Sequence, residues 1–230
     1  TYRARVNDET VHGRLLLSNG EGRVNFPHKP DWIVANEGGH GFYRVRYGPE
    51  FLTPLLRSPA DTMTSIERFN LVNDAWAATL AGILPATDFL DLTARFKREA
   101  DRYVWTPILA SLGYIARVIP AELRPELSRV VRDRMGEAMA RLGWSPEPGE
   151  SDLVRELRGD ILRTMGTLGD DSRVQREARQ RYTSGGESGV PDPNVLAAVI
   201  AIVAHTGGEA DYDDFRTRFK AAKTPQDEQR

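Results

Sequence analysis

The chain has 230 residues, with 31 Lys or Arg, 33 Asp or Glu and no Cys. The formal net charge of −2 provides no positive field for nucleic acid or an anionic membrane. Without cysteine there is no disulfide framework and no thiolate chemistry, which favours a cytoplasmic location. No apolar run reaches the ~18 residues of a membrane span, and the first residues lack signal-peptide character. Composition therefore favours a globular protein whose partners are neither nucleic acid nor membrane.

Residues 2–47 alternate short apolar runs with turn residues, a pattern typical of antiparallel strands. The turn pairs Asn19-Gly20 and Gly38-Gly39 separate some of these runs. Because such short strands bury little surface, we expect residues 1–48 to be part of a β-sandwich domain that receives further strands from polypeptide before Thr1. The predicted strands are Tyr2–Val6, Gly13–Leu17, Gly22–Phe26, Trp32–Ala35 and Phe42–Tyr47.

From Pro49 the apolar period changes to 3.6, which predicts a helical domain over residues 49–230. Thr64-Ser-Ile-Glu67 has the pattern of a capping box, and Asp192-Pro193 combines a cap with a first-turn proline. The last-but-one predicted helix is apolar almost all round, so we expect it to be central. Helices are predicted over roughly Glu50–Leu56, Thr64–Leu80, Thr87–Lys97, Arg102–Val118, Ala121–Leu142, Ser151–Leu168, Ser172–Tyr182, Val195–Ala204 and Asp211–Ala222.

Apolar spacing also predicts which side chains face the core of each helix. The final predicted helix should pack through Tyr212, Phe215 and Phe219. The other predicted core positions are Ile66, Phe69, Val72, Trp76 and Leu80 in one helix, Leu123, Leu127, Val130 and Val131 in a second, and Val154, Leu157, Ile161, Met165 and Leu168 in a third.

Consecutive antiparallel helices joined by short links predict stacked pairs, as in a HEAT-like or armadillo-like superhelix. The expected fold class is therefore mainly α, with a small antiparallel β-sandwich fragment followed by an α-superhelix. Thr224-Pro225-Gln-Asp227 has the pattern of another helix start. We expect the helical domain to be truncated there, which would leave an apolar face near the last helices for self-association.

The sequence contains no recognisable catalytic constellation. A zinc peptidase uses a His-Glu-x-x-His helix, but the four histidines are followed by Gly13, Lys29, Gly41 and Thr206. No Gly-x-Ser-x-Gly nucleophile elbow occurs either. The glycine-rich stretch Glu37–Gly41 connects two predicted strands, so it is interpreted as a hairpin turn instead of a phosphate loop. We therefore assign no catalytic and no metal-binding residue to this chain.

The stretch from Trp32 to Tyr47 contains Asn36-Glu-Gly-Gly-His-Gly-Phe-Tyr-Arg-Val-Arg-Tyr47 and leads into the helical remainder. It resembles a junction in the aminopeptidase N and puromycin-sensitive aminopeptidase family of zinc metallopeptidases. There a Trp-led strand, an Asn-x-x-x-x-Gly-[Phe/Tyr]-Tyr-Arg-Val-x-Tyr strand and a long helical domain occur in this order. Further segments resemble the family in register: Glu67–Trp76, Tyr103–Leu109, Leu157–Leu168, Asp192–Ala201 and Thr224–Asp227.

This resemblance implies that the parent protein is a single-zinc aminopeptidase that removes N-terminal residues from peptides. In the family, the zinc motif and the Gly-x-Met-Glu-Asn strand lie upstream of this junction, and neither motif is in the 230 residues. The chain is then a noncatalytic C-terminal region that forms the wall and lid of the substrate cavity. Its expected partners are the catalytic domain of the same polypeptide and, through the parent enzyme, peptide substrates. The alternative is an autonomous α-solenoid protein-binding module.

Arg158 is the candidate substrate-binding residue. It lies in the segment that resembles the family's Leu-Arg helix. A guanidinium on an inward face can receive the C-terminal carboxylate of a peptide through a two-pronged bond. A surface or intramolecular salt bridge is the competing interpretation.

Overall fold

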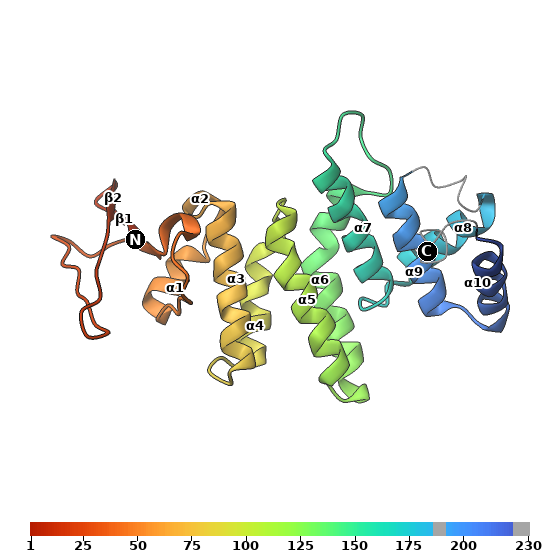
Figure 1. The fold of residues 1–230 in the computed structure, drawn as a ribbon, viewed down its shortest axis with the longest axis horizontal. Helices are drawn as coiled ribbons and strands as arrows, with labels where there is room; N and C mark the ends of the chain where they lie inside the picture. The colour runs from red at the N-terminus through yellow and green to blue at the C-terminus, as the bar shows by residue number, and fades with distance from the viewer. Residues whose placement is uncertain (186–191, 223–230) are drawn as a thin grey trace. The chain divides into compact units, whose positions relative to one another are not determined.

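The computed structural model describes residues 1–185 and 192–222, which fall into two compact units, 1–111 and 112–230 (Figure 1). Within the described residues, the strands belong to the first unit, and both units contain helices. The predicted class, mainly α with a small antiparallel β fragment, is confirmed. The superhelix stays a prediction, as does the assignment of residues 1–48 to a domain of their own.

The sheet contains β1 (Tyr2–Val6), β2 (Glu9–Gly13) and β3 (Trp32–Ala35) in the antiparallel order β2-β1-β3. Both residues between β1 and β2, Asn7 and Asp8, have positive φ, which suits the tightest class of hairpin turn. Because the chain reverses there, β2 begins at Glu9, and the predicted strand Gly13–Leu17 is wrong. The predictions for β1 and β3 are confirmed.

Two other predicted strands, Gly22–Phe26 and Phe42–Tyr47, are absent from the described sheet. The Asn19-Gly20 turn is present, since Ser18 and Glu21 form an isolated antiparallel bridge around it. That hairpin goes no further. In the second segment, the backbone N–H of Val45 donates to a carboxylate of a helix instead of to a neighbouring strand. Alternating apolar residues therefore did not predict strand pairing at either place.

Helices follow directly after Gly48 in the first unit. Glu67 accepts a hydrogen bond from the backbone N–H of Thr64 at 2.8 Å, as the capping-box prediction requires. A short 3₁₀ helix, η1 (Glu37–Gly39), lies between β3 and α1. The elements are α1 (Pro49–Leu55), α2 (Pro59–Thr62), α3 (Ser65–Leu80), α4 (Ala86–Thr93), η2 (Ala94–Phe96) and α5 (Arg102–Val118), which continues into the second unit.

The core-facing side of α3 differs from the predicted one. Val72 is fully buried as predicted, but Ile66 and Leu80 are 46% and 56% exposed. The buried face instead carries three charged residues together with Leu71 and Val72: Glu67, Arg68 and Asp74. The hydrophobic spacing of α3 did not predict this buried face. Its charged side chains can be buried because each has an ion-pair partner elsewhere in the first unit.

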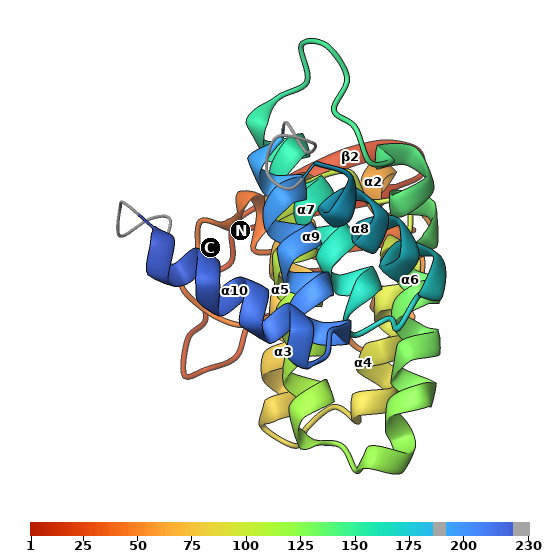
Figure 2. The same cartoon turned by 90° about the vertical axis from the view of Figure 1, so that its right-hand side faces the viewer.

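In the second unit, a central helix is surrounded by its neighbours, as predicted (Figure 2). This helix, α9, packs on α7, α8 and α10. Its first turn is capped by Asp192, whose carboxylate accepts from the N–H groups of Asn194 and Val195. The elements are η3 (Ala121–Leu123), α6 (Arg124–Leu142), α7 (Asp152–Gly166), α8 (Ser172–Gly185), α9 (Pro193–Thr206) and α10 (Glu209–Ala221).

The predicted core positions of the second unit are partly confirmed. Leu127 and Val131 of α6 and Leu157, Ile161 and Met165 of α7 are buried. The wrong predictions concern the ends of the unit, where Leu123 is 47%, Tyr212 66% and Phe219 56% exposed. The helix start at residues 224–227 lies outside the described residues. None of the described helices is both long and apolar enough to cross a bilayer.

Two glycines allow α7 and α9 to approach closely. A Cβ on Gly159 would lie 2.8 Å from the backbone oxygen of Asn194, and one on Gly166 would lie 2.6 Å from Ile202 side-chain atoms. Gly159→Ala is therefore expected to lower the free energy of unfolding by about 1–3 kcal/mol, because a backbone atom cannot move aside as a side chain can.

Gly136 in α6 is the matched control for this prediction, since a Cβ there meets no atom within 4 Å. Gly136→Ala is expected to raise the free energy of unfolding by about 0.5–1 kcal/mol through helix propensity. Urea denaturation of both variants measures the difference, and equal effects would contradict the close approach of α7 and α9.

Candidate functional site at the strand-to-helix junction

The junction segment is closed at its start by one asparagine. Asn36 has φ 57°, and its side chain accepts from the N–H of Gly41 at 2.6 Å and donates to the carbonyl of Gly41 at 3.0 Å. A Cβ on Gly41 would lie 2.1 Å from the Tyr43 ring and 2.9 Å from the Asn36 amide oxygen. The Asn and Gly of the family-like motif therefore form a closed loop over residues 36–41.

The rest of the motif is attached to the neighbouring elements by two further contacts. The carboxylate of Asp74 accepts from Arg44 Nη1 and from the N–H of Val45, both at 2.9 Å. The Tyr47 hydroxyl accepts from the N–H of Ala35 at 3.0 Å, and burial raises the pKa of this hydroxyl to about 12. The Arg and the second Tyr of the motif thus hold residues 42–47 between β3 and α3.

Glu67 joins three elements of the junction. Its Oε1 accepts from Gly38 N at 3.0 Å and Arg3 Nη1 at 3.2 Å, and its Oε2 accepts from Thr64 N at 2.8 Å and Arg3 Nη2 at 2.7 Å. Burial alone would raise the pKa of this carboxyl, but the hydrogen bonds from the two backbone amides and Arg3 lower it below its ordinary value. Glu67 is therefore held as a carboxylate.

A second buried ion pair lies deeper in the first unit. Arg68 donates to Glu99 through Nε at 2.7 Å and Nη2 at 3.0 Å, and to the carbonyl of Met63 through Nη1 at 2.8 Å. Trp105 Nε1 donates to the carbonyl of Glu99 at 3.0 Å. These contacts connect α3 to the start of α5.

A polar hollow of about 610 Å³ lies beside Glu67 and its hydrogen-bond partners. Arg3, Glu37, Glu67 and His12 are among the residues that line it, and His12 Nδ1 lies 2.7 Å from Glu37 Oε1. The hollow contains no nucleophile paired with a base. Its arginine Arg3 forms ion pairs with both Glu67 and Glu37.

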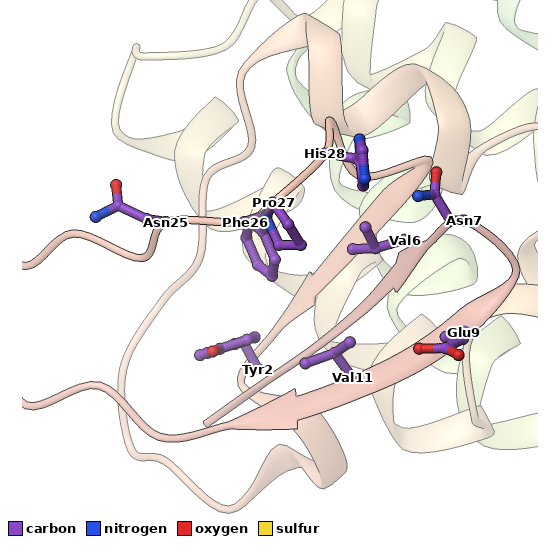
Figure 3. Close-up of a pocket in the computed structure, with 9 residues that line it drawn as sticks. All are labelled: Tyr2, Val6, Asn7, Glu9, Val11, Asn25, Phe26, Pro27 and His28. Carbon is purple, nitrogen blue, oxygen red and sulfur yellow. The ribbon is translucent and has the colours of Figure 1, made fainter.

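A smaller hollow of about 380 Å³ lies on the other face of the sheet (Figure 3). Tyr2, Val6 and Val11 project from the strands toward Phe26 and the neighbouring residues 25–28. The rings of Tyr2 and Phe26 meet edge to face with centroids 5.9 Å apart. This mainly apolar lining suits packing, in agreement with the prediction of an incomplete sandwich, which itself stays a prediction.

The described residues do not fit a zinc site. Across residues 1–185 and 192–222, no three His, Cys, Asp or Glu side chains are grouped so that they could hold a metal ion. His12 contacts Glu37 in the polar hollow, which His40 also lines, but these side chains do not form a group that could hold a metal ion.

Arg158 is 1% exposed and makes an intramolecular two-pronged bond. Its Nη1 and Nη2 donate to the two carboxylate oxygens of Glu150 at 2.6 and 2.7 Å, and its Nε donates to the carbonyl of Leu142 at 3.0 Å. The pairing lowers the pKa of Glu150 below its ordinary value. These contacts are the ones expected from the competing interpretation, in which Arg158 forms an intramolecular salt bridge. The substrate-binding role of Arg158 stays a prediction.

The sequence did not predict that four charged residues would take part in the ion pairs described above: Arg3, Asp74, Glu99 and Glu150. A signal was present in α3, where Arg68, Leu71 and Asp74 recur at helical spacing and share the buried face. The partners of these charges lie far along the chain or in loops. No periodic pattern identifies them.

Comparison with known proteins gives one consistent result. Aminopeptidase M1 of Arabidopsis thaliana is 26% identical over 89% of this chain and 24% of its own length. The puromycin-sensitive aminopeptidase of Caenorhabditis elegans is 27% identical over 80% of this chain and 20% of its own length. The alanine/arginine aminopeptidase of Saccharomyces cerevisiae is 25% identical over 90% of this chain and 25% of its own length.

The chain thus spans about a quarter of the length of these relatives. The family model described as the ERAP1-like C-terminal domain matches residues 32–230, which begin at β3 and include the junction and all the described helices. The resemblance inferred from the junction motif is confirmed, and the chain belongs to the ERAP1-like C-terminal domain family.

Proposed function

We propose that this chain is the noncatalytic C-terminal region of a zinc aminopeptidase that removes N-terminal residues from cytoplasmic peptides. The observation that carries the proposal is the family match over residues 32–230, together with relatives that are aminopeptidases. In this proposal the helices form the wall and lid of the substrate cavity and contact the distal part of the peptide. Zinc belongs to the catalytic domain of the parent polypeptide.

The contacts of the junction support this role. A wall or lid needs a defined attachment to the rest of the enzyme, and Asn36, Asp74 and Glu67 fix the segment between the sheet and the first long helix. None of these side chains is arranged for bond cleavage. A positioning role for these residues is enough to account for the family-like motif, and no catalytic role is needed.

The coding sequence immediately upstream of Thr1 tests the proposal. A His-Glu-x-x-His motif with a distal glutamate is the expected result. An initiator methionine just before Thr1 would favour the alternative, an autonomous α-solenoid binding module. In a second test, the isolated chain is expected to release no p-nitroaniline from amino-acid p-nitroanilides with added zinc. Chelator-sensitive turnover would contradict a noncatalytic role.

The lid role is tested in the parent enzyme. Removal of the helical region is expected to change the dependence of kcat/KM on peptide length more than the rate with a single amino-acid p-nitroanilide, because only peptides extend to a distal contact. Charge reversal at Arg158 should shift the same length dependence if its guanidinium receives a peptide carboxylate. An unchanged length preference would remove that role.

We also propose that the chain self-associates through α10. Tyr212 and Phe219 are exposed on this helix, whereas Phe215 packs on Tyr182 with ring centroids 5.6 Å apart. Phe219→Asp is expected to weaken dimer formation at least tenfold by placing a charge in an apolar contact. Leu16→Asp, at an 87% exposed leucine of the first unit, is the control. Sedimentation equilibrium measures both, and a wild-type monomer at about 100 μM would contradict the proposal.

A further inference from the structure

The carboxylate of Glu67 lies where the sheet, the turn after β3 and the N-terminus of α3 meet. Arg3 belongs to β1, Gly38 to the turn and Thr64 to the helix cap, and all three donate to this one side chain. The Glu67 side chain is 1% exposed and each oxygen accepts two hydrogen bonds. Breaking the Arg3 contact would therefore remove the direct link from β1 to Glu67, while the two backbone contacts can remain.

Arg3 has a second carboxylate within reach. Its Nη1 lies 3.7 Å from Glu37 Oε1, and Glu37 lines the same polar hollow as Glu67. The Glu37 side chain is 23% exposed, whereas that of Glu67 is almost fully buried. A small rotation of the guanidinium would replace its two-pronged pairing with the buried Glu67 by a pairing with the more exposed Glu37. The arginine would then still have a partner.

Several other groups bear on this exchange. Arg3 also donates to the carbonyl of Thr62 at 2.8 Å and lies 5.7 Å from the centre of the Trp32 ring, so it stays anchored between β3 and the helices in the observed arrangement. His12 of β2 contacts Glu37 and competes with Arg3 for that carboxylate. In the observed arrangement Arg3 is hydrogen-bonded to Glu67, and Glu37 lies 3.7 Å away as a second, longer ion-pair partner.

We propose that Arg3 and Glu67 form a latch with two positions. In the closed position Arg3 binds Glu67 and fixes β1 to the first turn of α3. In the released position Arg3 binds Glu37 alone, and β1 loses its direct hydrogen bonds to Glu67 in the first turn of α3. The latch is a property of residues 1–111 alone, and it does not depend on the aminopeptidase role of the parent.

Hydrogen exchange measured by mass spectrometry on the 230-residue chain tests the latch. Glu67→Gln keeps the shape of the side chain and removes its charge, which weakens its hold on Arg3. The expected result is an increase of at least tenfold in the exchange rates of amides in β1 and β3, with unchanged rates in α9. Glu37→Gln is the matched control, because it removes the released position, and it should leave the β1 rates unchanged or lower.

Arg3→Lys, which keeps the charge but loses the two-pronged geometry, should reproduce the local increase in a milder form. Equal acceleration in the sheet and in α9 would show general destabilisation and would overturn the latch. Unchanged exchange in Glu67→Gln, or the same increase in Glu37→Gln, would also overturn it. None of these readouts involves peptidase activity, so failure of the latch would leave the proposed function standing.

Discussion

Glu99→Ala is expected to lower the free energy of unfolding by about 3–5 kcal/mol, the range for breaking a buried ion pair by removing one partner. The side chains of Arg68 and Glu99 are 11% and 5% exposed. Without Glu99, the guanidinium of Arg68 would stay buried with only the carbonyl of Met63 as a strong acceptor. The amides of Ala100 and Asp101, which donate to Glu99 at 2.9 and 2.8 Å, would also lose their acceptor.

Urea denaturation of the variant measures this effect, and Glu126→Ala provides the control. Glu126 is also paired with an arginine, Arg129, but these two side chains are 64% and 65% exposed. An exposed pair contributes about 0–1 kcal/mol. The double variant Arg68→Met/Glu99→Met should recover part of the loss, because it removes both charges together. A cost for Glu99→Ala no larger than that for Glu126→Ala would contradict the buried pair.

The second large effect is expected at Arg158. Arg158→Met should lower the free energy of unfolding by about 3 kcal/mol at neutral pH, because Glu150 would lose its partner and the carbonyl of Leu142 its donor. Arg129→Met, at the exposed pair with Glu126, is the control and should change stability by less than about 1 kcal/mol.

The effect of Arg158→Met should also depend on pH in a defined direction. The pKa of Glu150 is lower in the folded chain than its ordinary value, because Arg158 donates hydrogen bonds to the carboxylate. Its contribution to stability is therefore present above that ordinary pKa and disappears as the pH falls through the lowered folded value. The difference between wild type and Arg158→Met, measured by thermal unfolding, should shrink below about pH 4. A difference that grows on acidification would contradict the pairing.

Much of the helical architecture could be predicted from local patterns. Asp192-Pro193 located the start of α9 because cap chemistry is encoded within three residues. The predicted bounds of α5 are also confirmed, although Pro107 lies inside that helix. Junction residues could be recognised through their family resemblance, but the motif did not reveal what each one contacts. Asn36 and Gly41 are close in sequence, whereas Asp74 reaches Val45 across 29 positions.

The failures have a common physical origin. Ile66 and Leu80 follow the apolar period of α3, yet Glu67, Arg68 and Asp74 occupy the buried face because their charges are matched by residues that periodicity does not reveal. Strand predictions failed where pairing depends on a partner outside the local pattern, as at Phe42–Tyr47. Arg158 is buried, and its partner, Glu150, could not be predicted because it lies at the end of an irregular loop.

One consequence of the Arg158 contacts concerns protein engineering. The same side chain binds the carbonyl of Leu142 and the carboxylate of Glu150, so it joins the two ends of the connection between α6 and α7. The intervening tip contains Gly143 and Gly149, both with positive φ. Closing a loop whose ends are already joined costs only about 0.6 kcal/mol more for each doubling of its length. The tip is therefore a suitable place to insert a fluorophore-binding peptide or an affinity tag without disturbing the helices on either side.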